Sequence, residues 1–554
     1  MLNSKNTDMS QVSGHEDHFA ADRMPAAAAL PEFLYDLPEL NYPDKLNAAA
    51  ELLDKNIAAG RGDKIAILTP ETSWTYRDLF EKSNQIAHIL VEDMGLKSGN
   101  RVLLRSANNP LLVACWFAVL KAGGIAVTTM PLLRAQDLIP VISKAEISLA
   151  LCDVRLAEEL EIAKALAPVL ERVFYFNGQD SGLESLMAGK KTEFEPVATA
   201  AKDIALIAFT SGTTGNPKGT LQYHQDIMSM CHCMGSRLLN ITEDDVIIGS
   251  PPLAFTFGLG ALVAFPFHAG ATTILLEAAA PDVYLAAIAR FRASWSFTAP
   301  TAYRAMLARL QDKTQDYDLS SLKACVSAGE HLPLPTFNTW ASATGLRMID
   351  GIGATEMIHI FISAVGDDIR PGATGKPIPG YQACILNSDN KPVPPGVVGR
   401  LAVKGPTGCK YLADDRQAAY VQGGWNVTGD AYKMDADGYF WFQARADDMI
   451  VSSGYNIGGP EVEAALMAHP AVAECAVVAA PDEGRGQIVK AFVVLTPDYQ
   501  AGDELISELQ RFVKQAIAPY KYPRAIDFVN SLPKTETGKI QRFVLRQQEQ
   551  EKKV

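Results

Sequence analysis

The sequence predicts an α/β protein with a large N-terminal domain of doubly wound sheets plus a β-rich subdomain, and a small mobile C-terminal α/β domain. Three observations predict this fold. Short β-branched runs alternate with amphipathic helical segments, strand-rich patterns follow near residue 375, and a second, shorter α/β pattern begins after residue 445. The length of 554 residues also favours several domains, because single hydrophobic cores stop growing at roughly 250–300 residues.

The first domain is expected over residues 26–445, after a polar, flexible leader at residues 1–25. Helical patterns at 75–95 and 109–124 separate short apolar runs that are typical of buried strands. The runs are "KIAIL" (64–68), "RVLLR" (101–105), "ISLALC" (147–152), "RVFYF" (172–176) and "IALIAFTS" (204–211). Strands that alternate with helices of this length predict a mostly parallel sheet with helices on both faces.

The later part of this domain is rich in turns and strands. "GKPIPGY" (375–381) and "YKMDADGYFWFQAR" (432–445) predict a β-rich subdomain. Asp437-Gly438 predicts a hairpin with a type I′ turn. The C-terminal domain is expected over residues 446–554, where "GPEVEAALMAHP" (459–470) predicts a helix with proline in its first turn and a second proline after its end.

The charge balance argues against some partners. The chain carries 63 acidic and 50 basic residues, a formal charge of −13, and this disfavours nucleic acid or an anionic membrane as the main partner. The eight cysteines are scattered, mostly through apolar runs, and "CHC" (231–233) lacks a second ligand pair for zinc. No secretory signal or long apolar run is visible, so we expect a cytoplasmic protein.

One loop carries the clearest chemical signal. "FTSGTTGNPKG" (209–219) follows an apolar strand and combines hydroxyls, glycines and one lysine. Backbone N–H groups, hydroxyls and an ammonium group together bind phosphate. This loop is not a Walker A loop, because Lys218 is followed by Gly219 and preceded by Pro217. A plain polar turn after a buried strand is the alternative interpretation.

The same stretch resembles the phosphate-loop signature of the adenylate-forming superfamily, which includes acyl-CoA synthetases, peptide-synthetase adenylation domains and luciferases. Four further motifs resemble this superfamily in the expected order: "GIGATE" (351–356), "TGD" (428–430), "RADDMIVSSGYN" (445–456) and "PKTETGK" (533–539). "SAGEHLP" (327–333) and "SPPLAFTFGLG" (250–260) resemble the benzoate-CoA and 2-aminobenzoate-CoA ligase branch.

The resemblance implies a two-step ligase reaction. A carboxylate attacks the α-phosphate of ATP to give an acyl-adenylate and pyrophosphate, and the thiol of CoA then displaces AMP. The cofactors implied are ATP and Mg²⁺, with CoA as co-substrate, and a homodimer is plausible. A medium-chain acyl-CoA synthetase and an adenylation enzyme that loads a carrier protein stay open as alternatives, whereas a nucleotide switch or motor fits less well because the Walker context is missing.

The resemblance also assigns the nucleotide residues. The pyrophosphate end of ATP would be held by Thr210, Ser211, Gly212, Thr213, Thr214 and Lys218. Thr355 would contact the α-phosphate and Glu356 would bind magnesium. Asp430 would accept both ribose hydroxyls, and Arg445 would add a ribose or phosphate contact. The adenine would be framed by Ala328, Gly329, Glu330, Asp350, Gly351 and Ile352.

Lys539 is expected to be catalytic, because the family's lysine in this loop bridges the α-phosphate and the carboxylate. The alternative is a solvated lysine in a flexible tail. Asp447 is expected to be the hinge of the small domain, and Ser453 and Gly454 would bind CoA. The acid pocket would be lined by Phe255, Thr256, Phe257, Gly353, Ala354 and His359. His359 has a plain alternative as a core residue, and the lack of an acidic residue in 250–260 favours a simple carboxylic acid over an amino acid.

Overall fold

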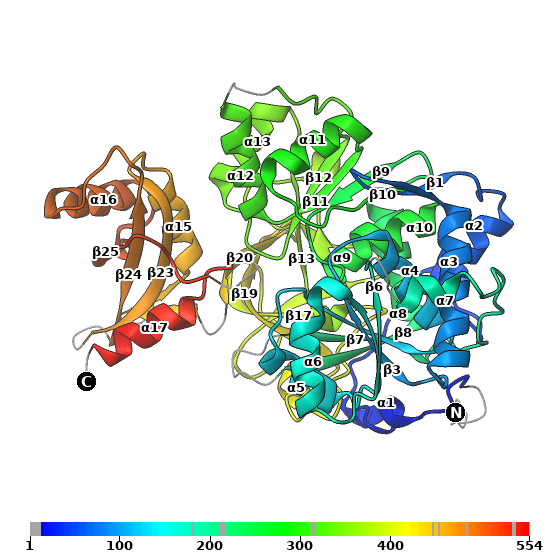
Figure 1. The fold of residues 1–554 in the computed structure, drawn as a ribbon. Helices are drawn as coiled ribbons and strands as arrows, with labels where there is room; N and C mark the ends of the chain where they lie inside the picture. The colour runs from blue at the N-terminus through cyan, green and yellow to red at the C-terminus, as the bar shows by residue number, and fades with distance from the viewer. Residues whose placement is uncertain are drawn as a thin grey trace.

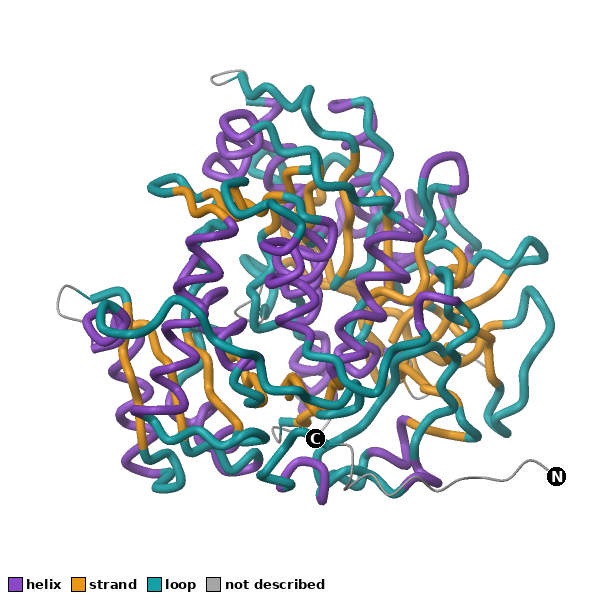
Figure 2. Tube along the Cα trace, turned by 90° about the vertical axis from the view of Figure 1, so that its right-hand side faces the viewer, coloured by secondary structure: helices purple, strands orange, loops and turns teal. Residues whose placement is uncertain are grey.

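The computed structural model describes residues 13–178, 182–210, 217–312, 316–445, 448–452, 455–482, 486–534 and 539–552. A large body holds most of the chain, and the C-terminal residues form a smaller lobe beside it (Figure 1). Turned by 90°, the body shows its strands running between helices (Figure 2). The predicted α/β class and the division into a large and a small part are confirmed.

The first sheet of the body is six-stranded, in the order β6-β5-β3-β4-β7-β8. The strands are β3 (Arg101–Arg105), β4 (Ile125–Thr129), β5 (Leu149–Asp153), β6 (Arg172–Phe176), β7 (Ile204–Thr210) and β8 (Lys218–Tyr223). Its helices include α3 (Tyr76–His88), α4 (Pro110–Lys121), α5 (Ala135–Lys144), α6 (Ala157–Leu166), α7 (Gly182–Met187) and α8 (His224–Met230). The parallel strands β3, β4 and β5 are buried along their whole length, which explains their continuous apolar runs.

The second sheet has nine strands, in the order β15-β14-β13-β12-β11-β9-β10-β1-β2. They are β1 (Ile65–Leu68), β2 (Ser73–Thr75), β9 (Val246–Gly249), β10 (Thr272–Ile274), β11 (Trp295–Thr298), β12 (Ala324–Ala328), β13 (Ile349–Gly353), β14 (Ile360–Ser363) and β15 (Lys376–Pro377). The helices α9 (Thr256–Leu259), α10 (Phe265–Ala269), α11 (Pro281–Phe291), α12 (Pro300–Gln311) and α13 (Leu334–Thr344) belong to this part. The strands from β1 to β13 along the sheet are parallel, and β2, β14 and β15 pair antiparallel at its two ends.

The predicted β-rich subdomain is an antiparallel sheet. It contains β16 (Gln382–Leu386), β17 (Val398–Lys404), β18 (Val421–Gln422), β19 (Trp425–Met434) and β20 (Phe440–Arg445). The hairpin at Asp437-Gly438 is confirmed by the pairing of β19 with β20. The type I′ turn is wrong, because Gly438 has φ +82° whereas Asp437 stays outside the left-handed region. The Asp435 N–H instead donates to the Tyr439 carbonyl at 2.9 Å, which closes a three-residue loop.

The smaller lobe is built around β23 (Val472–Asp482), which pairs antiparallel with β24 (Gly486–Leu495), and β25 (Ala525–Phe528), which lies parallel to β24. A short ribbon of β21 (Ile450–Ser452) and β22 (Tyr455–Ile457) precedes it, and the helices are α15 (Gly459–Met467), α16 (Asp503–Ala516) and α17 (Arg542–Glu551). The predicted helix at 459–470 is confirmed by α15, with Pro460 in its first turn. Within the described residues, none of the helices combines the length and apolar character needed to cross a bilayer.

Part of the expected leader is packed against the body. Ser13 Oγ donates to Asp203 Oδ1 at 2.6 Å, and the Gly14 N–H donates to Asp203 Oδ2 at 2.7 Å. Helix α1 (Phe19–Asp22) places the Phe19 ring 4.3 Å from the guanidinium carbon of Arg101. Residues 13–25 therefore differ from a floppy leader, because hydrogen bonds to Asp203 and the contact of Phe19 with Arg101 attach this segment to the body. Residues 1–12 lie outside the described part of the chain.

His224 begins α8 and is fully buried. The Ala48 N–H donates to its Nδ1 at 3.1 Å, so this nitrogen acts as an acceptor and the ring is neutral. Burial lowers the pKa of His224 to about 3. The buried neutral ring makes folding dependent on pH, because the unfolded chain binds a proton that the folded chain excludes.

We expect this histidine to destabilise the protein in mild acid. Its contribution is fully present above the ordinary histidine pKa of 6.5 and is lost as the pH falls towards 3, by about 1.4 kcal/mol per pH unit. In His224→Gln the amide oxygen can accept from Ala48, so the melting temperature should fall less between pH 7 and pH 5 than in the unchanged protein. His18→Gln, at an exposed position, is the control. Equal pH dependence in His224→Gln and the unchanged protein would contradict the assignment.

Candidate active site

The predicted site residues gather between the two sheets of the body, where several strands end. Thr210 ends β7, Ala328 ends β12 and Gly353 ends β13. Gln222 on β8 reaches across, and its Nε2 donates to the Thr355 carbonyl at 2.9 Å. The carboxyl ends of strands in α/β sheets are the usual place for ligands, so the topology itself places these residues around one site.

Glu356 lies at the centre of a buried polar group. It occupies a short 3₁₀ turn, Thr355–Met357, and is only 7% exposed. Tyr411 Oη donates to Glu356 Oε1 at 2.5 Å. Lys218 Nζ donates to Tyr411 Oη at 3.1 Å and lies 3.7 Å from Glu356 Oε1. A carboxylate, a hydroxyl and an ammonium group thus share one site, and sequence reasoning did not single out Tyr411.

The backbone beside Glu356 is strained. Ile358 has φ +63°, a conformation that β-branched residues rarely adopt. Such strain persists only where the surrounding structure fixes it, and it concentrates at functional sites. Thr407 contributes to that restraint, since its Oγ1 donates to the Met357 carbonyl at 2.9 Å.

Asp430 and Arg445 face each other across the β19–β20 hairpin. Arg445 Nη1 donates to Asp430 Oδ1 at 3.0 Å. Gly429, with φ +79°, lies directly before Asp430, and a Cβ there would be 3.2 Å from Arg445 Nη2. The tight turn therefore brings a buried carboxylate and a half-exposed guanidinium together, as the ribose assignment requires.

Lys539 comes to the same place from the smaller lobe. Its residue is exposed at the surface, yet the loss of surrounding water lowers the pKa of its ammonium group, while nearby Glu330 and Asp430 act to raise it and Arg445 to lower it. These interactions place Lys539 within electrostatic reach of the predicted nucleotide residues. The catalytic role of Lys539 stays a prediction.

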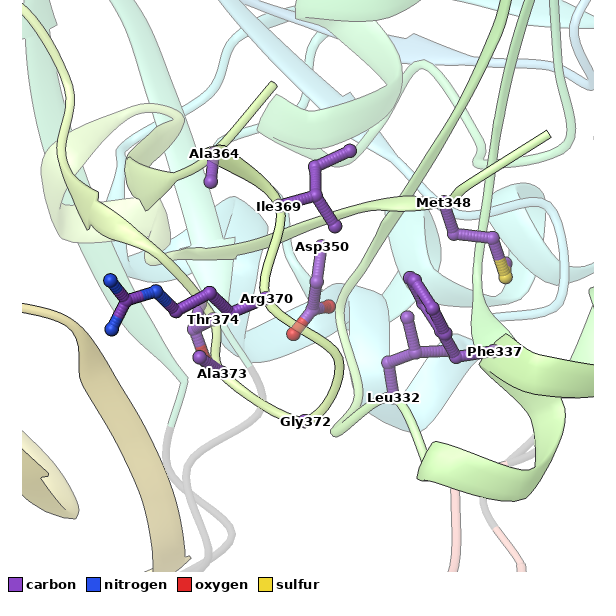
Figure 3. Close-up of a pocket in the computed structure, with 10 residues that line it drawn as sticks. All are labelled: Leu332, Phe337, Met348, Asp350, Ala364, Ile369, Arg370, Gly372, Ala373 and Thr374. Atoms are coloured by element: carbon purple, nitrogen blue, oxygen red, sulfur yellow. The ribbon is translucent and has the colours of Figure 1, made fainter. Parts of the chain in front are cut away.

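Asp350 on β13 belongs to the stretch predicted to frame the adenine. Its carboxyl group faces a small pocket that Leu332, Phe337 and Thr374 also line (Figure 3). Burial raises the pKa of Asp350 to about 8, so the group is largely protonated at neutral pH and can donate as well as accept a hydrogen bond. Gly329 has φ +88°, and Thr301 Oγ1 donates to the Glu330 carboxylate at 3.1 Å.

The residues predicted for the acid pocket meet around His359. The His359 ring lies 5.7 Å from that of Phe257 and 4.8 Å from that of Phe265, between ring centroids. A Cβ on Gly353 would lie 2.7 Å from the His359 carbonyl, and one on Gly260 would lie 2.4 Å from its Cδ2. Phe255 and Thr256 stand at the start of α9, and Ala354 follows Gly353 directly.

His359 is a buried, neutral histidine. Neither ring nitrogen has a hydrogen-bond partner of good geometry among the described residues. Burial lowers the pKa of His359 to about 3, and only the Phe257 backbone opposes this shift. A buried polar group without a hydrogen-bond partner calls for an explanation. A ligand group that forms a hydrogen bond with one of the ring nitrogens would supply that partner.

Several predicted residues lie outside the described part of the chain: Ser211, Gly212, Thr213, Thr214, Asp447, Ser453 and Gly454. Their roles remain predictions. The flanks of the phosphate loop are described, and Thr210 pairs with Lys218 across the β7–β8 hairpin. Thr210 Oγ1 is buried without a hydrogen-bond partner among the described residues. A hydroxyl of this kind can donate a hydrogen bond to a phosphate oxygen.

The side chains at the centre fit a hard cation bound together with ATP. Glu356 supplies a carboxylate oxygen, and Mg²⁺ in nucleotide sites typically uses one or two carboxylates plus substrate phosphates and water. No group of three or more His, Cys, Asp or Glu side chains that could hold a metal occurs in the described ranges.

Comparison with known proteins supports the same conclusion. The AMP-binding enzyme family matches residues 54–411, and the AMP-binding enzyme C-terminal domain matches residues 461–539. Benzoate–CoA ligase of Thauera aromatica is 35% identical over 514 residues, which cover 92% of this chain and 97% of that protein. The mitochondrial acyl-coenzyme A synthetase ACSM3 of Homo sapiens is 33% identical over 92% of this chain and 91% of its own length.

Among solved structures, the anthranilate CoA ligase AuaEII in complex with anthranoyl-AMP superposes with a TM-score of 0.88 at 36% identity, covering 93% of this chain and 99% of that one. The matches run through both the body and the smaller lobe. The chain therefore belongs to the AMP-binding enzyme family, in the branch of the benzoate- and aminobenzoate-CoA ligases, and is an AMP-forming acyl- or aryl-CoA synthetase.

Proposed function

We propose that the protein is an ATP-dependent aryl-CoA ligase that converts a benzoate- or 2-aminobenzoate-like acid first to an acyl-adenylate and then to a CoA thioester. The observation that carries the choice of acid is the aromatic enclosure of His359 beside Gly353, next to Glu356. Flat rings and small backbone-exposing residues favour a planar substrate over a branched one.

In the first half-reaction the negatively charged carboxylate of the acid has to approach the negatively charged phosphates of ATP. Lys218 and the Thr210 hydroxyl lie where the leaving pyrophosphate would be held, and Thr355 lies beside the α-phosphate position. Glu356 would hold Mg²⁺, which supplies charge neutralisation on the phosphates when bound. Fixed positive and dipolar groups stabilise developing charge without reorganisation, which is how these side chains would lower the barrier.

The nucleoside part would be held by the hairpin residues. Asp430, with two acceptor oxygens, suits the two ribose hydroxyls, and Arg445 keeps it in place at 3.0 Å. Asp350 and the backbone of Gly329 and Gly351 would frame the adenine, where a largely protonated carboxyl can both give and receive a hydrogen bond.

The second half-reaction would use another face of the smaller lobe. We propose a domain of residues 26–445 and a mobile domain of residues 446–554, with Asp447 as the hinge. Ser453 and Gly454 would then let the CoA arm approach the acyl carbon. Hinges are short segments that absorb large φ/ψ changes between rigid bodies, and Asp447 follows closely in the sequence on β20, which ends at Arg445.

A medium-chain acyl-CoA synthetase is the second candidate. The full-length similarity to the human synthetase ACSM3 favours it, since the chain is nearly as similar to that protein as to the benzoate–CoA ligase. A carrier-loading adenylation enzyme would differ from both candidates in the acceptor of the acyl group, which would be a carrier protein in place of CoA.

A panel of acids separates these candidates. We expect benzoate and 2-aminobenzoate to give at least about tenfold higher kcat/KM than hexanoate or octanoate, because a flat slot costs a flexible chain its conformational freedom. The measurements are pyrophosphate release and AMP release, each with and without CoA. Preference for the aliphatic acids would favour the second candidate, and AMP release that ignores CoA would favour a carrier-loading enzyme.

Lys539→Ala should disable adenylation selectively. We expect pyrophosphate release to fall by at least about 100-fold, as loss of one preorganised donor does, while thioester formation from supplied acyl-adenylate and CoA is largely kept. Lys534→Ala is the matched control, because Lys534 is in the same loop but pairs with Glu474 at 2.8 Å. Equal loss of both half-reactions in Lys539→Ala would argue against separate faces for the two steps.

His359→Phe tests the acid pocket. The substitution keeps a flat ring but removes both nitrogens, so activity on 2-aminobenzoate should fall about tenfold relative to benzoate if the ring meets the ortho amino group. The measurement is the ratio of kcat/KM values for the two acids. His232→Phe, a remote histidine that contacts Tyr42 and His268, should leave the ratio unchanged, and an unchanged ratio in His359→Phe would show that the nitrogens do not face the acid.

A further inference from the structure

Tyr411 is a buried residue that the mechanism above does not use. It is 1% exposed, and its hydroxyl donates to Glu356 Oε1 at 2.5 Å while accepting from Lys218 Nζ at 3.1 Å. The hydroxyl therefore stands between the carboxylate assigned to the metal and the ammonium group assigned to the phosphates. A hydrogen bond to a charged group is stronger than one between neutral groups, so this hydroxyl is well suited to fix a carboxylate.

The segment that carries Tyr411 is held firmly on both sides. The Leu221 N–H donates to the Lys410 carbonyl at 2.7 Å, and the Leu412 N–H donates to the Gly219 carbonyl at 2.8 Å. The Tyr411 N–H donates to Gln417 Oε1 at 3.0 Å. The segment thus runs along β8 as an added strand, and the ring has a fixed starting point.

The ion pair next to Tyr411 adds a second anchor. Lys410 Nζ lies 2.8 Å from Asp226 Oδ2 and donates to the Gly408 carbonyl at 3.0 Å, and the side chains of both ion-pair partners are fully buried. Breaking such a pair is costly because it leaves a buried charge alone. The position of the Tyr411 backbone is therefore set without any help from its own hydroxyl.

The backbone of the Glu356 turn is also held without Tyr411. Gln222 Nε2 donates to the Thr355 carbonyl at 2.9 Å, and Thr407 Oγ1 donates to the Met357 carbonyl at 2.9 Å. The Tyr411 hydroxyl therefore acts on the Glu356 side chain and not on its backbone. Glu356 and Lys218 already form a long ion pair of 3.7 Å, and without the hydroxyl between them this pair would shorten and direct both charges away from the ligand.

We propose that Tyr411 is a positioning residue that holds the Glu356 carboxylate towards the cation accompanying ATP and limits how closely it pairs with Lys218. The inference rests on the proposed role of Glu356 as the magnesium ligand. Under this proposal Tyr411, which is 55 positions from Glu356 in the sequence, orients the Glu356 carboxylate before the nucleotide binds.

The test is equilibrium binding of ATP to full-length Tyr411→Phe, measured by calorimetry without acid or CoA, once with MgCl₂ and once with EDTA. We expect affinity to fall about tenfold with MgCl₂, because a hydrogen bond to a charged group is lost, and to change little with EDTA. Tyr284→Phe is the matched control, since Tyr284 is equally buried and its hydroxyl bonds Ser296 at 3.0 Å, away from the site. Equal loss in both conditions, or no loss in either, would overturn the proposal.

A double-mutant cycle with Glu356→Gln shows whether Tyr411 acts through Glu356. We expect Tyr411→Phe to have almost no further effect on magnesium-linked binding in the Glu356→Gln background, and fully additive losses would overturn the proposal. If Glu356→Gln leaves the magnesium dependence of ATP affinity unchanged, the assigned role of Glu356 is wrong and the proposal fails with it. If Glu356→Gln behaves as expected and Tyr411→Phe does not, the inference about Tyr411 fails alone.

Discussion

Strand β8 is the element on which the site depends. It pairs with β7, so that Thr210 lies opposite Lys218. Its other edge receives the segment around Tyr411, and its Gln222 side chain holds the backbone of Thr355. Because buried polar groups need partners, each of these contacts constrains the next one. The phosphate loop, the Glu356 turn and the β-rich subdomain therefore share one buried strand, and moving any of them would break hydrogen bonds in the other two.

The electrostatics of the site oppose those of the whole chain. The protein carries a formal charge of −13, yet the substrates of a CoA ligase, an acid, ATP and CoA, are all anionic. Lys218, Arg445 and Lys539 supply positive charge at the proposed site, each from a different part of the chain. Low-dielectric walls strengthen such a local field, and the pKa of Lys539 is shifted down by desolvation, with Glu330 and Asp430 opposing the shift. A local cluster is enough, because the field that a bound anion experiences is set by its nearest groups.

Much of the fold could be predicted because its signals are local. Alternating apolar runs and helical periods identified the sheets, and Asp437-Gly438 identified the β19–β20 hairpin. The turn type could not be predicted, since it depends on loop length: with three residues in the loop, only Gly438 needs a positive φ. The packing of residues 13–25 was missed because its partner Asp203 is some 190 positions away, and composition carries no information about so distant a contact.

The site residues also fall into those that the sequence could identify and those that only tertiary contacts reveal. Glu356, Asp430 and Lys539 stand in short motifs, so sequence alone could assign them a role. Tyr411 stands in no such motif, and its role comes from a contact across 55 positions. The environment of His359 is likewise a product of tertiary packing, since Phe257 and Phe265 reach it from another segment. Motifs identify the groups that touch the ligand, whereas the residues that orient those groups become visible only in three dimensions.

The proposed site combines regions of different charge, which suits two different recognition tasks. The region proposed for the phosphates and the ribose contains two basic side chains, Lys218 and Arg445, and two acidic ones, Glu356 and Asp430. The regions assigned to the rings are kept neutral, since burial raises the pKa of Asp350 to about 8 and lowers that of His359 to about 3. A charged group beside an apolar ring would have to lose its water without gaining a partner. Neutral groups of fixed shape avoid that cost, so under the proposed function the charged groups act on the phosphates, and shape and single hydrogen bonds select the acid.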